Sequence, residues 1–74
     1  MKNYYEVAER TKINDDDIIY YNGYDFKEAN KKYNMVLNYV DKKTSSVELR
    51  VYKVDEDLIE ALLYGYDIIK ERRF

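Results

Sequence analysis

Tyrosine is the side chain suited to chemistry or binding that this chain carries in surplus. It accounts for ten of the 74 residues, while His, Cys and Trp are absent. Its ring offers apolar contact area and a hydroxyl at little entropy cost, which suits recognition. Histidine is the most frequent general base and, with cysteine, the usual ligand of structural zinc. We therefore predict that the protein is not an enzyme and that it needs no metal or other cofactor.

Three consecutive aspartates, Asp15, Asp16 and Asp17, are the strongest candidate for a metal site. A calcium loop that began at Asp15 would need a glycine at its sixth position and a glutamate at its twelfth. The sequence has Tyr20 and Phe26 at those two positions. Adjacent side chains of an extended chain also point to opposite sides, so the three carboxylates do not readily converge. We predict a solvated turn here.

Other residues that could do chemistry lack partners of the right type. Ser45 and Ser46 have no histidine to act as their base. The acids between Asp55 and Glu60 surround a predicted helix start, where capping and the helix dipole account for them. Gly23 and Gly65 are the two glycines of the chain, which excludes a glycine-rich phosphate loop. The sequence therefore predicts no catalytic residue.

The tyrosines carry the argument for binding. Tyr5 and Tyr33 fall on apolar faces, and Tyr66 is a further candidate for the core. The others are too many for so small a body to hide, and exposed aromatic residues are enriched at the centres of protein interfaces. The alternative is that scattered surface rings have no role. We predict a partner-binding surface formed by Asp15, Asp16, Asp17, Tyr20, Tyr24, Tyr52 and Tyr64.

The elements that must position these residues begin with two strands. Residues 2–13 alternate between apolar and polar types, and Ile18–Tyr21 is β-branched and aromatic, so both segments are predicted strands of a hairpin. Asn14–Asp17 forms the turn between them. Asn22-Gly23 is a second turn signal.

A long amphipathic helix is predicted over Phe26–Lys43. Asp25 and Glu28 have the spacing of a capping box at its start, and Lys42 and Lys43 complement the helix dipole at its end. The residues that face the sheet recur at helical spacing: Phe26, Ala29, Tyr33, Val36, Leu37 and Val40.

The second half of the chain is predicted to hold a strand, a short helix and a final strand. Val47–Tyr52 alternates between apolar and polar residues, which is typical of a strand with one wet face. The next helix begins after Asp55 or Asp57, with a core of Leu58, Ile59, Leu62 and Leu63. Gly65 either ends that helix before a fourth strand at Tyr66–Arg72 or lies inside a longer helix. The β-forming residues after it favour the strand.

These elements predict an α+β fold in one domain, residues 1–74: a small, mainly antiparallel sheet in the order β-β-α-β-α with a possible final β, and helices packed on one face. A domain of this size without disulfides supplies a small core, so a homodimer is a reasonable expectation.

Charge and hydropathy narrow the class of partner. Charged residues make up 38% of the chain but sum to only −2, so no strong positive field favours nucleic acid. The basic pairs of the chain with exposed tyrosines keep open a nucleotide or single-strand binder that stacks bases on the rings. Apolar stretches are too short for a membrane span, and acids interrupt any secretory signal. We expect a cytoplasmic protein without a membrane partner.

The chain resembles the small accessory proteins with which phages inhibit host enzymes. This resemblance rests on the size, the Tyr-, Asp- and Asn-rich composition, and the helix entry Tyr21–Ala29 between strands. The group includes anti-CRISPR proteins, inhibitors of other anti-phage systems and inhibitors of uracil-DNA glycosylase, whose β-β-α-β order is similar to that from Tyr4 to Val54. The resemblance implies a host protein target in the host cytoplasm, which the chain would block by steric occlusion.

Two further functions stay open beside inhibition of a host protein. One is the binding of nucleotides or single-stranded nucleic acid by tyrosine stacking, and the other is an oligomerising structural subunit. Acidic residues of the chain would steer the approach to a basic partner more than they add affinity.

Overall fold

The sheet is built around two ten-residue strands, β1 (Lys2–Thr11) and β3 (Ser45–Val54). They pair antiparallel along their full lengths, from Lys2 opposite Val54 to Thr11 opposite Ser45. Two shorter strands, β2 (Ile18–Gly23) and β4 (Asp67–Arg72), pair with β1 and β3 respectively, and the strand order is β2-β1-β3-β4.

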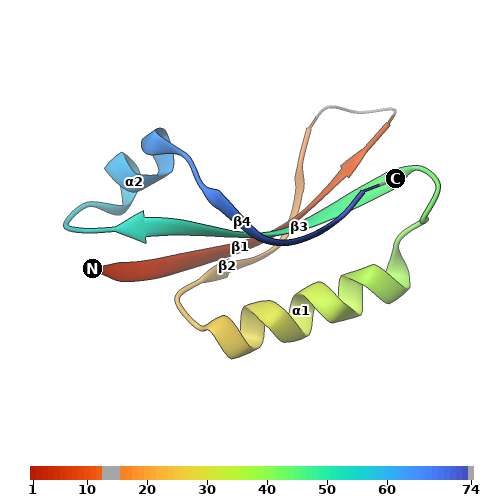
Figure 1. The fold of residues 1–74 in the computed structure, drawn as a ribbon, viewed down its shortest axis with the longest axis horizontal. Coiled ribbons are helices and arrows are strands. Elements are labelled where there is room, and N and C mark those ends of the chain that lie inside the picture. The colour runs from red at the N-terminus through yellow and green to blue at the C-terminus, as the bar shows by residue number, and fades with distance from the viewer. Residues whose placement is uncertain (13–15, 74) are drawn as a thin grey trace.

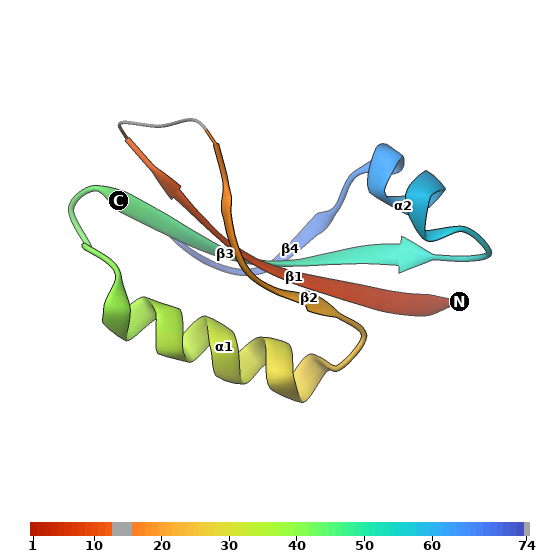
Figure 2. The same ribbon diagram turned by 180° about the vertical axis from the view of Figure 1, so that it is seen from behind.

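The computed structural model describes residues 1–12 and 16–73, and over these residues it has four strands in one antiparallel sheet and two helices, α1 (Phe26–Tyr39) and α2 (Leu58–Tyr64). The predicted α+β fold is confirmed, including the final strand. Figures 1 and 2 show α1 along one side of the sheet and α2 at one end of the molecule, where β3 ends and the N-terminus lies.

The core lies between α1 and the two central strands. Val7 of β1 and Val47 and Leu49 of β3 are completely inaccessible to solvent, because their side chains lie on the face of the sheet that α1 covers. α1 contributes Ala29, Tyr33 and Val36 to the same cluster, so the predicted apolar stripe is confirmed at its centre. Phe26, at the start of the stripe, stays exposed and packs its ring at 5.3 Å from that of Tyr5.

α1 begins at the predicted residue, with Asp25 as its N-cap, but the Asp25 N–H donates to the Tyr21 hydroxyl at 3.3 Å and not to Glu28, so only half of the predicted capping box forms. The Asp25 carboxylate accepts hydrogen bonds from the backbone N–H groups of Lys27 and Glu28, at 2.9 and 3.3 Å. Two of the amides that no helical carbonyl reaches are thereby satisfied.

The end of α1 was predicted wrongly. The helix stops at Tyr39, four residues before Lys43, because Val40 is extended and the Asp41 carboxylate accepts from the N–H of Lys43 at 2.8 Å. This aspartate turn competes with a further helical turn. The cation at the helix C-terminus is Arg72 of β4, whose Nη1 donates to the Leu37 carbonyl at 3.1 Å.

Two other local predictions are corrected or fall outside the structure. Asn22 and Gly23 form no turn; they are the last residues of β2, opposite Glu6 and Tyr5, and α1 follows after Tyr24 and Asp25. β1 ends at Thr11, so Lys12 lies beyond the strand. Ile13, the predicted end of the strand, lies outside the described residues, as do Asn14 and Asp15 of the predicted turn.

α2 differs most from its prediction. Asp57 is its N-cap, and Gly65 ends it with a φ of 102°, a conformation that glycine tolerates best. Its buried residue is Ala61, which lies near Val51 and Lys53 of β3. The predicted core residues Ile59, Leu62 and Leu63 are exposed, and Leu58 is half-buried, because the helix meets the end of β3 and not the centre of the sheet.

Candidate binding face

The face of the sheet opposite α1, here called the open face, carries the candidate site. Glu6 and Arg50 occupy it because they alternate with the core residues Val7 and Leu49 and lie opposite each other in register. The prediction that β3 has a wet face is wrong at two positions. Arg50 is 3% exposed and Tyr52 is 7% exposed, although α1 lies on the other side of the sheet.

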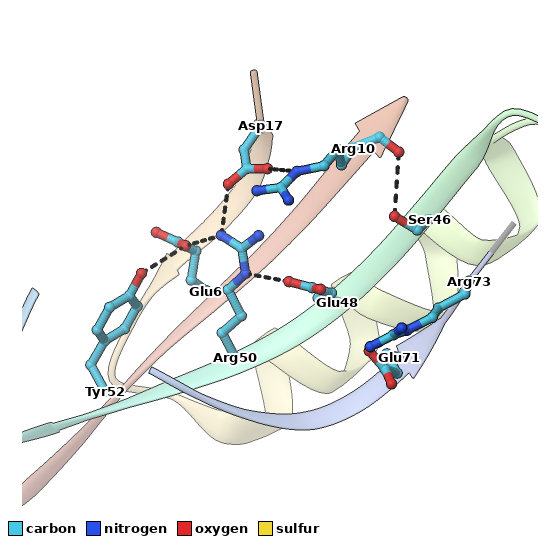
Figure 3. A network of polar contacts seen from close by, with 9 residues as sticks. All are labelled: Glu6, Arg10, Asp17, Ser46, Glu48, Arg50, Tyr52, Glu71 and Arg73. Carbon is cyan, nitrogen blue, oxygen red and sulfur yellow. Dashed lines mark hydrogen bonds and ion pairs between the residues drawn. The ribbon is translucent and has the colours of Figure 1, made fainter. Parts of the chain in front are cut away.

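Arg50 is the centre of an ion cluster, the arginine cluster, formed with Glu6, Asp17 and Glu48. Its Nη1 donates to Glu6 Oε1 at 2.8 Å and to Asp17 Oδ2 at 3.0 Å, and its Nε donates to Glu48 Oε1 at 2.7 Å. Figure 3 shows these side chains converging from β1, β3 and the segment before β2. The arginine cluster thus links Asp17, the residue that precedes β2, to the central strands β1 and β3.

Arg50 and Asp17 stabilise each other in their charged forms. Burial alone would lower the pKa of Arg50, but its hydrogen bonds to Asp17, Glu48 and Glu6 raise it above its usual value. Burial would raise the pKa of Asp17, yet the hydrogen bond and charge of Arg50, together with Arg10 at 3.1 Å, lower it. Arg50 and Asp17 therefore have no proton to exchange near neutral pH, and their pairing suits structure better than acid–base chemistry.

A row of four aromatic rings, the tyrosine row, crosses the open face beside the arginine cluster. The ring centroids are 5.2 Å apart for Tyr24 and Tyr4, 6.1 Å for Tyr4 and Tyr52, and 5.5 Å for Tyr52 and Tyr66, each pair edge to face. Tyr24 follows β2, Tyr4 lies on β1, Tyr52 lies on β3 and Tyr66 precedes β4. The row therefore spans the width of the sheet.

The inner and outer rings of the row differ in exposure. Tyr52 is held between Tyr4 and Tyr66, and its hydroxyl donates to Glu6 Oε1 at 3.1 Å. Burial, followed by the charge of Glu6, raises the pKa of Tyr52 to about 12. The outer rings are open to solvent: Tyr24 is 50% and Tyr66 is 40% exposed. The row thus presents two accessible rings on a fixed support.

The structure brings some of the predicted binding residues together and separates others. Tyr24 and Tyr52 belong to the tyrosine row, and Asp17 belongs to the arginine cluster. Asp16 is exposed beside it, and Asp15 lies outside the described residues. Tyr20 and Tyr64 lie elsewhere.

Tyr20 makes contacts within the fold, on the α1 side of the sheet. Its hydroxyl donates to Glu9 Oε1 at 2.5 Å, and Ser45 Oγ donates to the other oxygen of this buried carboxylate at 2.6 Å. Burial, then the hydrogen bond and charge of Glu9, raises the pKa of Tyr20 to about 12. The ring also meets that of Tyr39 at 6.4 Å.

Tyr4 and Tyr66 belong to the tyrosine row but are not among the predicted binding residues. Tyr66 was predicted as a core candidate, which is wrong, because it is exposed beyond Gly65. Tyr4 lies opposite Tyr52 in the β1–β3 register. That register joins residues far apart in the chain, so the pair has no local sequence signal.

The described residues hold no group of three or more His, Cys, Asp and Glu side chains arranged to bind a metal ion. Within the same part of the chain, neither helix is long and apolar enough to cross a membrane. Comparison with known proteins adds no assignment: no family model matches the chain, and no curated protein or solved structure is significantly similar to it.

Proposed function

We propose that this chain is a non-catalytic binding protein of the phage accessory type, which inhibits a host protein by steric occlusion through its open face. The observation that carries the proposal is the tyrosine row. Its outer rings, Tyr24 and Tyr66, are exposed, while the inner rings, Tyr4 and Tyr52, hold them in place. Large rings already fixed by their neighbours lose little conformational entropy on binding.

The charges of the open face indicate the chemistry of its partner. The arginine cluster has three carboxylates around Arg50, and Arg10 adds a second guanidinium through Asp17. The formal charges of these five groups sum to one negative charge. A protein surface with lysine or arginine around an apolar centre fits this arrangement, with the charges guiding encounter and the rings supplying contact area.

A second candidate function is suggested by the shape of the face. Some RNA-binding domains stack bases on aromatic rings of an open four-stranded sheet. Here Lys2 lies 5.7 Å from the Tyr24 ring and Arg50 lies 4.4 Å from the Tyr66 ring, but Arg50 is already paired with three carboxylates. The inner ring Tyr52 is buried edge to face between two others and bonds to the carboxylate of Glu6, which repels phosphates. Protein binding is therefore the better supported function.

The test is capture of a host protein by the immobilised chain from cell lysate at moderate salt. We expect the Tyr24→Ser/Tyr66→Ser double variant to lose the captured protein, and a purified captured enzyme to lose activity when the wild-type chain is added. Tyr39→Ser is the matched control, because Tyr39 is 77% exposed and lies outside the row. Capture that the double variant retains in full contradicts the proposal.

Tyrosine fluorescence distinguishes the second candidate. Titration with nucleotides and single-stranded oligonucleotides should leave the emission of the wild-type chain unchanged if the partner is a protein. A saturable quench that the Tyr24→Ser/Tyr66→Ser variant loses would favour nucleic acid instead.

A further inference from the structure

The short helix α2 leaves its apolar side chains in solvent. Ile59 is 69% exposed, Leu63 is 83% exposed and Tyr64 is 85% exposed, while Leu62 is partly exposed beside them. The helix is held to β3 through Ala61, with Asp57 as its cap. These four exposed side chains, Ile59, Leu62, Leu63 and Tyr64, are here called the α2 knob.

Apolar side chains clustered on one short element are a different matter from single exposed residues. Scattered apolar residues are normal on a protein surface, whereas a contiguous group marks an interaction site. Ile59, Leu62 and Leu63 share one helix face because they are spaced three and four residues apart, and Leu63 and Tyr64 border one hollow with Glu60. Their packing makes no contribution to the main core, whose cluster consists of residues from β1, α1 and β3.

The charges on the Tyr64 flank of the α2 knob are nearly all negative. Asp55, Glu56, Asp57 and Glu60 line one shallow hollow together with Ala61 and Tyr64, and Lys53 is the basic residue of that lining. Glu60 also borders a second hollow with Leu63 and Tyr64, so a partner that covers the knob meets carboxylates at this flank. Lysine or arginine side chains at its rim would match them, while acidic ones would be repelled.

We propose that the α2 knob docks against the apolar face of an amphipathic segment of a protein partner, with lysine or arginine at the rim of that face. A second copy of this chain, knob against knob, fits poorly, since it would bring two sets of carboxylates together. This surface goes beyond the proposed function, because it consists of residues outside the tyrosine row and needs none of them.

The probe is a pair of synthetic amphipathic peptides of equal length and pattern, one of leucine and lysine and the other of leucine and glutamate. We expect the leucine–lysine peptide to bind the isotope-labelled full chain, with amide shift changes confined to residues 55–65. The leucine–glutamate peptide should not bind. Added salt should weaken the complex, because the rim charges are exposed.

Variants separate apolar docking from simple charge attraction. Leu63→Ser and Ile59→Ser keep every charge, and each should weaken the leucine–lysine peptide about tenfold, the loss typical of an interface anchor. Met35→Ser is the matched control, since Met35 is an exposed apolar residue of α1. It should bind as the wild type does, and so should Tyr24→Ser/Tyr66→Ser, which isolates this inference from the proposed function.

Four results overturn the inference. They are binding of neither peptide, equal binding of both, shift changes centred on the open face, and full binding by Leu63→Ser. A fifth is a dimer in solution that Leu63→Ser dissociates, because the occupant of the knob would then be a second copy. Because both serine substitutions fall on exposed positions, an unchanged circular dichroism spectrum confirms that each variant is folded.

Discussion

The guanidinium carbon of Arg50 lies 4.4 Å from the centre of the Tyr66 ring, so the arginine cluster and the tyrosine row form one connected structure. Arg50 thereby packs against the exposed Tyr66 ring of the candidate site, while its nitrogen atoms bond to Glu6, Glu48 and Asp17. A cation over an aromatic face is attractive, and more so where water is excluded. The same residue therefore affects both stability and the shape of the open face.

Replacement of Arg50 by methionine should destabilise the fold severely. Glu6, Asp17 and Glu48 would be left together without their cation, and breaking a buried pair in this way costs about 3–5 kcal/mol. That is comparable to the whole stability of a domain of this size, on the order of 5 kcal/mol. Urea unfolding followed by circular dichroism measures the loss.

The matched control for that substitution is Arg73→Met. Arg73 pairs with Glu71 at 3.3 Å, but its side chain is 75% exposed, so the change should cost at most about 1 kcal/mol. Equal midpoints for the two variants would show that the arginine cluster does not stabilise the fold.

Acid should destabilise the protein through Asp17. The pKa of Asp17 is lowered in the folded state from an unfolded value of about 3.9. Its stabilisation is complete above the unfolded pKa, because both states are then ionised, and it disappears as the pH falls through the folded pKa. The free energy of unfolding should drop below about pH 4, and Asp17→Asn should flatten that part of the curve. A variant curve parallel to that of the wild type would refute this role.

Alkali should destabilise it through Tyr20 and Tyr52. Each phenol has its pKa raised to about 12, against about 10 in an unfolded chain. Their contribution is complete below about pH 10 and is lost as the pH rises towards 12, because the unfolded state releases its protons first. Ultraviolet absorbance of the phenolate should show late ionisation that Tyr20→Phe and Tyr52→Phe each reduce. Unchanged titration curves in these variants would assign the late ionisation to other rings.

The two helix caps should have unequal effects. Asp25→Ala should lower the stability of the whole domain by about 1 kcal/mol, since α1 covers the core. Asp57→Ala removes the equivalent bond to the Ile59 amide at 2.9 Å, yet α2 is largely outside the core. We expect hydrogen exchange to quicken in α2 with little change in the global unfolding midpoint. A larger global effect from Asp57→Ala would contradict this ranking.

Local signals explain which parts of the fold could be predicted. The start of α1 follows from Asp25 and the spacing of apolar residues, and the last strand follows from Gly65 and the β-formers after it. The end of α1 does not follow from the apolar spacing. It depends on a local turn in which the Asp41 carboxylate accepts from the Lys43 amide.

The open face depends on relationships that no short segment contains. Tyr4 meets Tyr52, and Glu6 meets Arg50, only because β1 and β3 pair in one register. The spacing of the apolar residues of α2 predicts a core face, but no residue within the helix signals that it meets the end of β3. Composition alone still indicated that the tyrosines exceed what the core holds, and Tyr24, Tyr39, Tyr64 and Tyr66 are exposed.

Both outer strands of the sheet contain a break in register. In β2 the pairing with β1 shifts between Val7 and Ala8, and in β4 the pairing with β3 shifts between Leu49 and Arg50. These irregularities interrupt both edge strands, so a strand of another molecule could pair with only a few consecutive residues. Edge-to-edge growth into fibrils is thereby disfavoured. Addition of a strand at either edge is therefore disfavoured, so we expect contacts with a partner to be made by side chains.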